Sequence, residues 1–435
     1  MSSNPISQNK INPKICFVLG TRPEIIKLYS CIKFCIDNNL NYFVIHTNQH
    51  YNPNMDLVFF QELQLPLPEF NLNVGSGNHA TQTAKMLIGI EEILLTHKPD
   101  IVIVQGDTNS TMAGALVATK MNIKVAHIEA GLRSYDRSMP EEINRIMVDH
   151  IADWLFVPTA DQSATLLKEG ISESKVHIVG NTVVDAVFGC KELSNTQSTI
   201  LNRLNLFSIE TLETLVDPKI QEANDEPEEF DLFSKNDNDK IPAISQKQEL
   251  DDLFGDLESE QPTVSTFNQV TKTTIKDYLL LTCHRPSNTD NSENFEAILG
   301  AVQELCVENN CVCVFPAHPR LQSQKALINT FDKIILIEPT GFVDSIALQS
   351  NSKMILTDSG GIQEESCILR CKAIVLRTNT ERPESVQVGG AVLLQSITKQ
   401  EIKNQFYNLI NKSVNWTNPF GDGQSAKSIM QIILK

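Results

Sequence analysis

The sequence contains no cysteine pair of the Cys-x-x-Cys type that zinc sites commonly use. Its ten cysteines are scattered along 435 residues. The most closely spaced include Cys31 and Cys35, four apart in a stretch with a helical pattern, and Cys311 and Cys313, which alternate in a strand-like run. Such cysteines suit the role of small buried hydrophobic residues. We therefore expect reduced thiols and no metal site.

Long apolar runs are also lacking, because none reaches the roughly 20 residues that a membrane-spanning helix needs. The first ten residues, MSSNPISQNK, do not have the basic and then apolar layout of a signal peptide. We expect a cytoplasmic enzyme that does not bind a membrane. The chain is longer than one hydrophobic core usually organises, so two domains are predicted.

Positive charge is scarce, since 36 Lys and Arg stand against 53 Asp and Glu and give a net charge of -17. This balance argues against nucleic acid as a partner. The negative charge is concentrated at residues 209–261, where 17 acidic residues accompany 4 Lys and no Arg, a net charge of -13. The rest of the chain carries only -4 and can bind anions.

Short apolar runs alternate with amphipathic helical stretches in two parts of the chain, which is the pattern of βαβ units in parallel sheets. The strands predicted in the first part are 15–19, 42–46, 101–105, 125–128 and 155–157. Those predicted in the second part are 278–282, 312–316, 334–337, 354–357 and 373–376. The sequence predicts an α/β protein in which two doubly wound, Rossmann-like domains, residues 1–205 and 275–420, face a cleft.

A polar segment at residues 206–274 separates the two patterns. It is rich in Asp, Glu, Asn and Ser, so it cannot bury enough apolar surface to offset the entropy of ordering, and we expect it to be mostly disordered. It contains the tripeptide Asp-Leu-Phe twice, at 231–233 and 252–254. Hydrophobic groups among acidic residues could dock on a protein partner; the alternative is a solvated linker.

The first predicted strand is followed by Gly20-Thr21-Arg22-Pro23-Glu24, which opens a helix. Free backbone N–H groups and the helix dipole favour a phosphate there, and Arg22 and Lys27 add positive charge. The alternative is a tight turn with a solvated arginine. The motif is not Gly-x-Gly-x-x-Gly, which disfavours a dinucleotide site.

Two acidic residues follow strands of the first domain, Asp107 in QGDT and Glu129 in HIEAGLR. Ligands of open parallel sheets bind at the carboxyl ends of strands, so the two carboxylates could flank a substrate. Each could instead be a loop acid that caps the next helix. Glu141 leaves the same choice open, because Ser138 and Glu141 fit a Ser-x-x-Glu capping box and Arg145 could pair with Glu141 along the helix.

The second domain has strand ends of basic or glycine-rich character. Thr357-Asp358-Ser359-Gly360-Gly361 joins a strand to a helix, and its glycines allow the backbone to approach a phosphate oxygen. Glu365, just over one turn further, could reach a ribose. The other candidates for binding a diphosphate are His284, His318, Arg377 and Arg382. A lone histidine is more often structural, yet several such strand ends in one domain favour a nucleotide diphosphate pocket.

Nine motifs in this order make the chain resemble the non-hydrolysing UDP-N-acetylglucosamine 2-epimerases: GTRPE, QHY, QGDT, HIEAGLR, PEEINR, GNTVVDA, the CHR strand end, TDSGGIQEE and TERPE. The resemblance covers residues 14–205 and 277–435. It implies a GT-B-like architecture whose last helix, within residues 421–435, returns to the first domain. It also implies no cofactor and a tendency to form homodimers.

The resemblance further implies interconversion of UDP-GlcNAc and UDP-ManNAc by elimination and re-addition of UDP through a 2-acetamidoglucal. The catalytic residues would be Asp107, Glu129, Glu141 and, near the leaving diphosphate, His284. UDP would be held by Arg22, Lys27, Ser359, Gly360, Gly361, Glu365 and Arg382. Departures from the family pattern at Asn48, Ser287 and 370–372 bear on the sugar preference.

Three alternatives stay open at this stage. One is 2-epimerisation of a modified UDP-2-acetamido sugar such as a 2,3-diacetamido uronate. The others are a GT-B glycosyltransferase and a catalytically silent UDP-sugar-binding scaffold.

Overall fold

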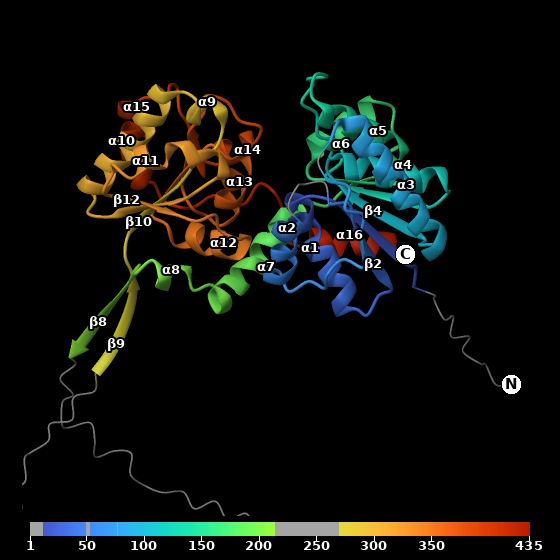
Figure 1. The fold of residues 1–435 in the computed structure, drawn as a ribbon, viewed down its shortest axis with the longest axis horizontal. Coiled ribbons are helices and arrows are strands. Elements are labelled where there is room, and N and C mark those ends of the chain that lie inside the picture. Colours follow the sequence, from blue (N-terminus) through green and yellow to red (C-terminus); the bar gives the residue numbers. More distant parts are fainter. Residues whose placement is uncertain (1–11, 49–52, 76, 214–268) are drawn as a thin grey trace, which may run out of the picture. The chain divides into compact units, whose positions relative to one another are not determined.

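The structure, a computed structural model, describes residues 12–48, 53–75, 77–213 and 269–435. It contains two parallel sheets (Figure 1). The first sheet, whose strands lie before residue 206, belongs to the first lobe and has the order β3-β2-β1-β4-β5-β6-β7. The second sheet, whose strands lie after residue 276, belongs to the second lobe and has the order β12-β11-β10-β13-β14-β15. Each order places the first strand of its lobe beside the fourth, which is the crossover point of a doubly wound fold. The predicted fold class is confirmed.

The strands of the first lobe are β1 (Ile15–Leu19), β2 (Tyr42–His46), β3 (Phe70–Asn71), β4 (Ile101–Gln105), β5 (Lys124–Ile128), β6 (Trp154–Val157) and β7 (Val176–Ile178). Its helices are α1 (Arg22–Asp37), α2 (Pro53–Glu62), α3 (His79–His97), α4 (Asn109–Lys120), α5 (Pro140–Ile151), α6 (Ala160–Lys168), α7 (Thr182–Gln197) and α8 (Ile200–Arg203). Strand β1 is apolar throughout because both of its faces are covered. Phe17 packs in the core formed with α1 and α7, whereas Val18 packs in the core formed with α3 and α4.

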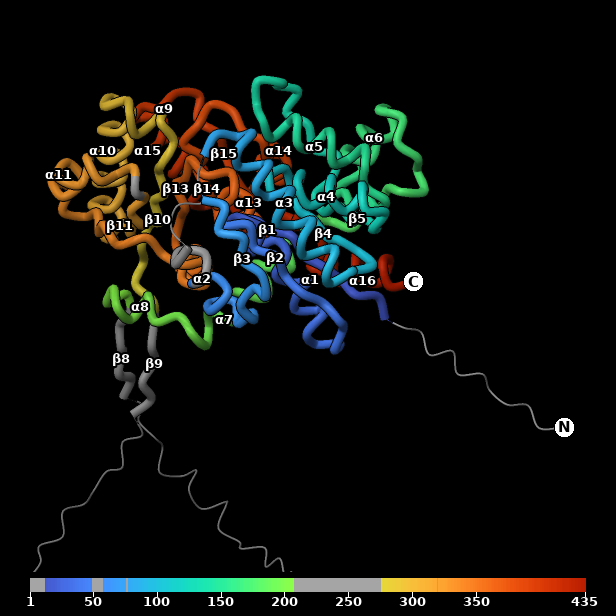
Figure 2. The backbone as a smooth tube through the Cα atoms, turned by 45° about the vertical axis from the view of Figure 1, so that its right-hand side comes forward, coloured from blue at the N-terminus to red at the C-terminus, as the bar shows by residue number. Residues whose placement is uncertain are grey.

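The strands of the second lobe are β10 (Tyr278–Thr282), β11 (Val312–Pro316), β12 (Ile334–Ile337), β13 (Met354–Thr357), β14 (Ala373–Val375) and β15 (Ala391–Leu393). Its helices are α9 (Pro286–Thr289), α10 (Ser292–Glu308), α11 (Lys325–Ile328), α12 (Phe342–Asn351), α13 (Gly360–Ile368), α14 (Pro383–Gln387) and α15 (Lys399–Ile410). The last helix, α16 (Ser425–Ile433), packs on α1 and α7 of the first lobe (Figure 2). Asp185 of α7 caps α16 by accepting hydrogen bonds from the backbone N–H groups of Ser425 and Ala426 at 3.3 and 2.9 Å.

The two lobes share part of one hydrophobic core. Phe342 and Ile346 of α12 and Cys367 of α13 belong to the same buried cluster as Val187 of α7. Helix α12 lies against α7, and the carboxylate of Glu62 on α2 accepts a hydrogen bond of 2.8 Å from the backbone N–H of Phe342. Side chains on α2 and α7 therefore help to hold the second lobe against the first.

The segment expected to lack structure, residues 206–274, contains two strands at its ends. β8 (Phe207–Glu213) and β9 (Gln269–Ile275) form an antiparallel pair that is a compact unit of its own. The signal was present in the sequence, because β9 is rich in the β-branched residues Val, Thr and Ile, which favour strands. The acidic middle, residues 214–268 with both Asp-Leu-Phe repeats, lies outside the described residues, as does the whole QHY motif at 49–51.

All ten cysteines are unpaired, nine of them buried and Cys371 half-buried. This confirms the interpretation of the cysteines as small core residues. Among the helices that the structure describes, none combines the length and the apolar character needed to cross a membrane.

Candidate active site

A cavity of about 580 Å³ lies where β10 and β13 end. Thr282 and Thr357 are register partners at these strand ends, and their hydroxyl oxygens are 2.6 Å apart. The chain leaves the two strands in different directions, which is why a ligand can bind at a crossover point. Eight of the predicted site residues line this cavity: Arg22, Lys27, His284, His318, Ser359, Gly361, Glu365 and Arg382.

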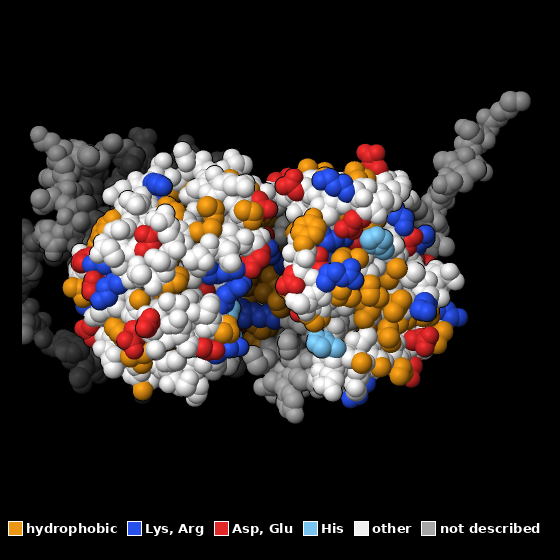
Figure 3. All heavy atoms as spheres, turned by 90° about the horizontal axis from the view of Figure 1, so that it is seen from above, with side chains coloured by type: hydrophobic (Ala, Val, Ile, Leu, Met, Phe, Trp, Pro, Cys, Tyr) orange, Lys and Arg blue, Asp and Glu red, His pale blue; other side chains and the backbone are white. Residues whose placement is uncertain are grey.

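The lining of the cavity combines apolar and basic groups. Leu280, Pro316, Ala317 and Leu348 contribute apolar surface, which suits a flat ring. Lys and Arg side chains gather in the hollow between the two lobes (Figure 3). Together these groups can hold a molecule that carries both an apolar ring and negative charge.

His284 is fixed by a buried carboxylate that sequence reasoning did not single out. Asp358 is fully buried and accepts hydrogen bonds from the backbone N–H groups of His284 and Arg285, and its Oδ1 lies 3.1 Å from Nδ1 of His284. Burial alone would raise the pKa of Asp358, but the hydrogen bonds from His284 and Arg285 lower it to about 2. An ionised Asp358 therefore holds the Nδ1–H of His284, and Nε2 is the nitrogen available to a ligand.

Arg382 is oriented by a second buried acid, Glu364. The carboxylate of Glu364 accepts hydrogen bonds from Nε of Arg382 at 3.1 Å and from the amide of Asn181 in the first lobe at 2.8 Å. Its charge raises the pKa of Arg382, which keeps the guanidinium charged. Sequence reasoning missed Glu364, although it lies in the TDSGGIQEE motif directly before the predicted Glu365.

Two predicted ligands of the diphosphate do not line the cavity. Arg377 forms a two-point ion pair with Glu381, at 2.8 Å for each contact, and donates to Asn379 at 3.0 Å. Its guanidinium is therefore already occupied. Gly360 begins α13 beside the lining residues Ser359 and Gly361 without itself lining the cavity.

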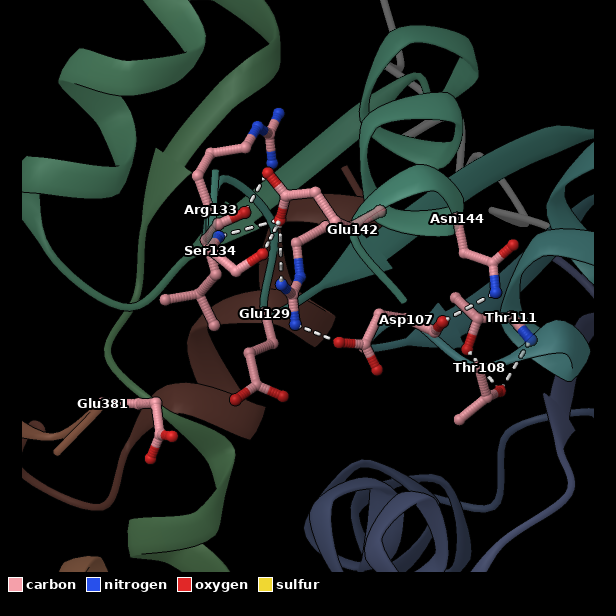
Figure 4. A network of polar contacts seen from close by, with 12 residues as sticks. Asp107, Thr108, Thr111, Glu129, Arg133, Ser134, Glu142, Asn144 and Glu381 are labelled. Atoms are coloured by element: carbon pink, nitrogen blue, oxygen red, sulfur yellow. Dashed lines mark hydrogen bonds and ion pairs between the residues drawn. The ribbon is translucent and has the colours of Figure 1, made fainter. Parts of the chain in front are cut away.

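Asp107 and Glu129 lie at the adjacent carboxyl ends of β4 and β5 (Figure 4). Glu129 has a φ of 66°, in the left-handed region that a non-glycine residue adopts at a cost. Nζ of Lys27 lies 2.7 and 2.6 Å from its two carboxylate oxygens, and the amide of Gln105 donates to it as well. Because Lys27 also lines the cavity, it joins Glu129 to the basic groups there.

The two carboxyl groups have opposite pKa shifts. Burial raises the pKa of Asp107, and its ion pair with Arg145 opposes that rise only in part. Burial would also raise the pKa of Glu129, but Lys27 and Arg382 reverse the shift and lower it. Neighbouring acids whose surroundings separate their pKa values are suited to exchange protons with a substrate between them.

The alternative interpretation of Ser138 and Glu141 as a capping box is wrong. Pro140 occupies the first position of α5, so Met139 is the N-cap and its side chain makes no capping hydrogen bond. The third helical position then belongs to Glu142, whose carboxylate accepts hydrogen bonds from the backbone N–H groups of Ser134 and Tyr135. Glu141, at the second position of the helix, is exposed.

Arg145 does not form the ion pair with Glu141 that the sequence left open. Its guanidinium contacts Asp107 and lies 3.9 Å from the carboxylate of Glu142. Ser138 instead donates a hydrogen bond of 2.6 Å to Asp136. Glu141 therefore does not cap α5. It does not line the cavity either.

This chain is similar in sequence and fold to known proteins. A family model described as UDP-N-acetylglucosamine 2-epimerase matches residues 34–214 and 248–434. The UDP-N-acetylglucosamine 2-epimerase of Methanocaldococcus jannaschii is 43% identical over 426 residues, 97% of this chain and 98% of that protein. A crystal structure of the M. jannaschii UDP-GlcNAc 2-epimerase in complex with UDP-GlcNAc and UDP is 40% identical, covers 97% of this chain and 99% of its own, and has a TM-score of 0.69. The UDP-2,3-diacetamido-2,3-dideoxy-D-glucuronate 2-epimerase of Pseudomonas aeruginosa is 29% identical, over 97% of this chain and 99% of its own length.

Proposed function

This chain belongs to the UDP-N-acetylglucosamine 2-epimerase family, and on that premise we propose that it interconverts UDP-GlcNAc and UDP-ManNAc. The observation that carries the proposal is that Lys27 contacts both the cavity and the pair of acids, Glu129 and Asp107, beside it. Lys27 lines the cavity of basic and apolar groups and also binds the carboxylate of Glu129, which lies beside Asp107. A nucleotide diphosphate in the cavity would bring its sugar toward these two acids.

The chemistry explains why acids and cations are both needed. The hydrogen on C2 of a 2-acetamido sugar is only weakly acidic, so its removal is coupled to loss of UDP from C1 and leaves a 2-acetamidoglucal. Re-addition of UDP, with a proton delivered to the opposite face of C2, inverts that carbon. These two steps require proton-transferring groups on two faces of the sugar ring. We assign that work to Asp107, Glu129 and Glu141.

The departing diphosphate gains negative charge at the bond that breaks. Arg22, Lys27 and Arg382 supply fixed positive charge at the cavity, and His284 offers a hydrogen bond through Nε2. Donors already in place for the developing charge lower the barrier without reorganisation. Ser359, Gly361 and Glu365 complete the UDP site, where Glu365 accepts a hydrogen bond of 2.6 Å from Gln349.

Turnover in deuterated water tests this mechanism. Purified protein is incubated with UDP-GlcNAc alone, and the sugars are followed by NMR. Deuterium is expected at C2 of both the product and the recovered substrate, because the returning proton comes from an acid that exchanges with solvent. Product without deuterium would exclude elimination, and no exchange at C2 at all would favour a glycosyltransferase or a silent binding scaffold.

A second candidate substrate follows from the P. aeruginosa relative, whose name specifies a UDP-2,3-diacetamido-2,3-dideoxy-D-glucuronate. The same elimination applies to that sugar, since the 2-acetamido group and the UDP leaving group are shared. Comparing kcat/KM for the two UDP-sugars decides which of them this chain prefers.

A further inference from the structure

Helix α12 of the second lobe begins without a cap of its own. Its N-cap residue is Gly341, which has no side chain that could accept a hydrogen bond from the first N–H groups of the helix. The acceptor comes from the first lobe instead. Oε2 of Glu62, the last residue of α2, accepts a hydrogen bond of 2.8 Å from the backbone N–H of Phe342. The start of α12 is therefore capped across the two lobes.

Gly341 leaves the room that this contact needs. A Cβ atom on Gly341 would lie 1.6 Å from Oε1 of Glu62 and 2.2 Å from its Cδ. The backbone does not require glycine here, because a φ of -68° with a ψ of 176° is open to most residues. The glycine thus allows the close approach of Glu62 and relieves no strain in the chain.

The start of α12 also borders the cavity. Pro339 and Thr340, directly before Gly341, line the cavity, and so do Ser345 and Leu348 on the helix itself. A shift of the first turn of α12 would therefore move several lining residues at once.

The last turn of α2 supports a lining residue of the first lobe as well. The guanidinium of Arg22 lies over the ring of Phe59, with its Cζ 4.6 Å from the ring centroid. Phe59 is one turn before Glu62 on α2. Neither Phe59 nor Glu62 lines the cavity, whereas Arg22 does. Helix α2 thus contacts Arg22 through Phe59 and the start of α12 through Glu62.

We propose that Glu62 is a positioning residue for the nucleotide, because by capping α12 it holds the lining residues of that helix where they can bind the same molecule as Arg22. The ligand-binding part of this inference rests on the proposed epimerase function. The capping part does not, because it concerns the resting protein.

Hydrogen exchange of the resting full chain tests the cap. In Glu62→Ala, the peptide that contains Phe342 and Val343 is expected to exchange at least about tenfold faster than in the wild-type protein. In Glu62→Gln the side-chain oxygen can accept the same hydrogen bond, so exchange should stay within about threefold of the wild-type rate. Equal rates in the wild-type protein and in Glu62→Ala would overturn the proposal.

Ligand binding tests the positioning role. Glu62→Ala is expected to raise both the KM for UDP-GlcNAc and the Kd for UDP, measured by calorimetry, about tenfold. It should leave kcat within about threefold, because Asp107 and Glu129 are held by Arg145 and Lys27 of the first lobe. Glu62→Gln should restore both KM and Kd to within about threefold of the wild-type values.

Thr398→Ala is the matched control. Thr398 is the N-cap of α15 in the second lobe, where its exposed hydroxyl accepts a hydrogen bond of 3.3 Å from the backbone N–H of Glu401. No residue of α15 lines the cavity. This variant should unfold at a lower urea concentration and keep the wild-type KM and Kd, which separates the loss of a helix cap in general from the loss of this one.

Gly341→Ala disturbs the same contact from its other side. Its new Cβ would displace the carboxylate of Glu62, so its KM and Kd should rise as in Glu62→Ala, and the double variant should be no worse than either single one. Wild-type KM and Kd in a folded Glu62→Ala, or effects that add in the double variant, would refute the positioning role. If Glu62→Ala does not fold, Gly341→Ala carries the same test. A wild-type protein that binds no UDP would refute the proposed function and leave the exchange result in force.

Discussion

The most quantitative test concerns Glu24, a buried acid of the GTRPE turn. Glu24 is 1% exposed, and its carboxylate accepts hydrogen bonds from the backbone N–H of Gly20 and from the hydroxyl groups of three threonines: Thr21, Thr108 and Thr111. Burial raises its pKa from 4.5 to about 6 in spite of these four donors. We propose the substitution Glu24→Gln, which has the same shape and no charge.

The sign of the effect follows from the raised pKa. The folded protein holds the proton of Glu24 more tightly than the unfolded chain, so this group stabilises the fold fully below pH 4.5 and loses that stabilisation as the pH rises through about 6. A shift from 4.5 to about 6 corresponds to about 2 kcal/mol. The glutamine side chain would keep the hydrogen bonds, since its oxygen can accept from Gly20 and Thr21 while its amide donates to the other two hydroxyl oxygens.

Urea denaturation of both proteins at several pH values, followed by the fluorescence of Trp154 and Trp416, measures this difference. Relative to Glu24→Gln, the wild-type protein should lose about 2 kcal/mol between pH 4.5 and pH 8. Glu142→Gln is the matched control of opposite sign. Hydrogen bonds from Ser134 and Tyr135 outweigh burial and lower the pKa of Glu142, so its stabilisation is lost as the pH falls. A wild-type minus Glu24→Gln difference that does not change with pH would refute the reasoning.

Three further predictions concern activity. The amide substitutions Asp107→Asn, Glu129→Gln and Glu141→Gln should each lower kcat at least about a hundredfold in the UDP-GlcNAc assay; normal turnover by Glu141→Gln would remove that exposed residue from the catalytic set. Arg382→Lys should raise KM about tenfold, because lysine cannot bind Glu364 through Nε and still present a planar pair of donors to a diphosphate. Replacing residues 214–268 by Asn-Gly should leave kcat and KM within about threefold, since Glu213 and Gln269 are register partners that a two-residue turn can join; loss of turnover in a folded variant would show that this segment serves the active site.

The positions of strand ends could be predicted from the sequence, but the hydrogen-bond partners of the side chains at those ends could not. Apolar runs bounded by turn residues predicted β10 with its observed bounds, because a strand buried on both faces leaves a continuous apolar signal. Asp358 gave no comparable signal, since its role depends on the backbone N–H groups of His284 and Arg285, more than 70 residues away. The capping-box alternative for Glu141 failed because of helix register: Pro140 set the start of α5 one residue later than the capping box required.

The GTRPE turn shows why topology alone does not locate a ligand. Both lobes have the same crossover between their first and fourth strands, and the described cavity lies at the strand ends of the second lobe, with α1 of the first lobe contributing Arg22 and Lys27 to its lining. In the first lobe the turn left two interpretations open, a phosphate site or a tight turn, and the N–H group of Gly20 donates to Glu24. A Cβ atom on Gly20 would lie 2.1 Å from Oγ1 of Thr47, so the turn is also closely packed. The carboxylate of Glu24 thus takes the place at the start of α1 that favours an anion, and Arg22, two residues earlier on the same helix, lines the cavity together with residues of the second lobe.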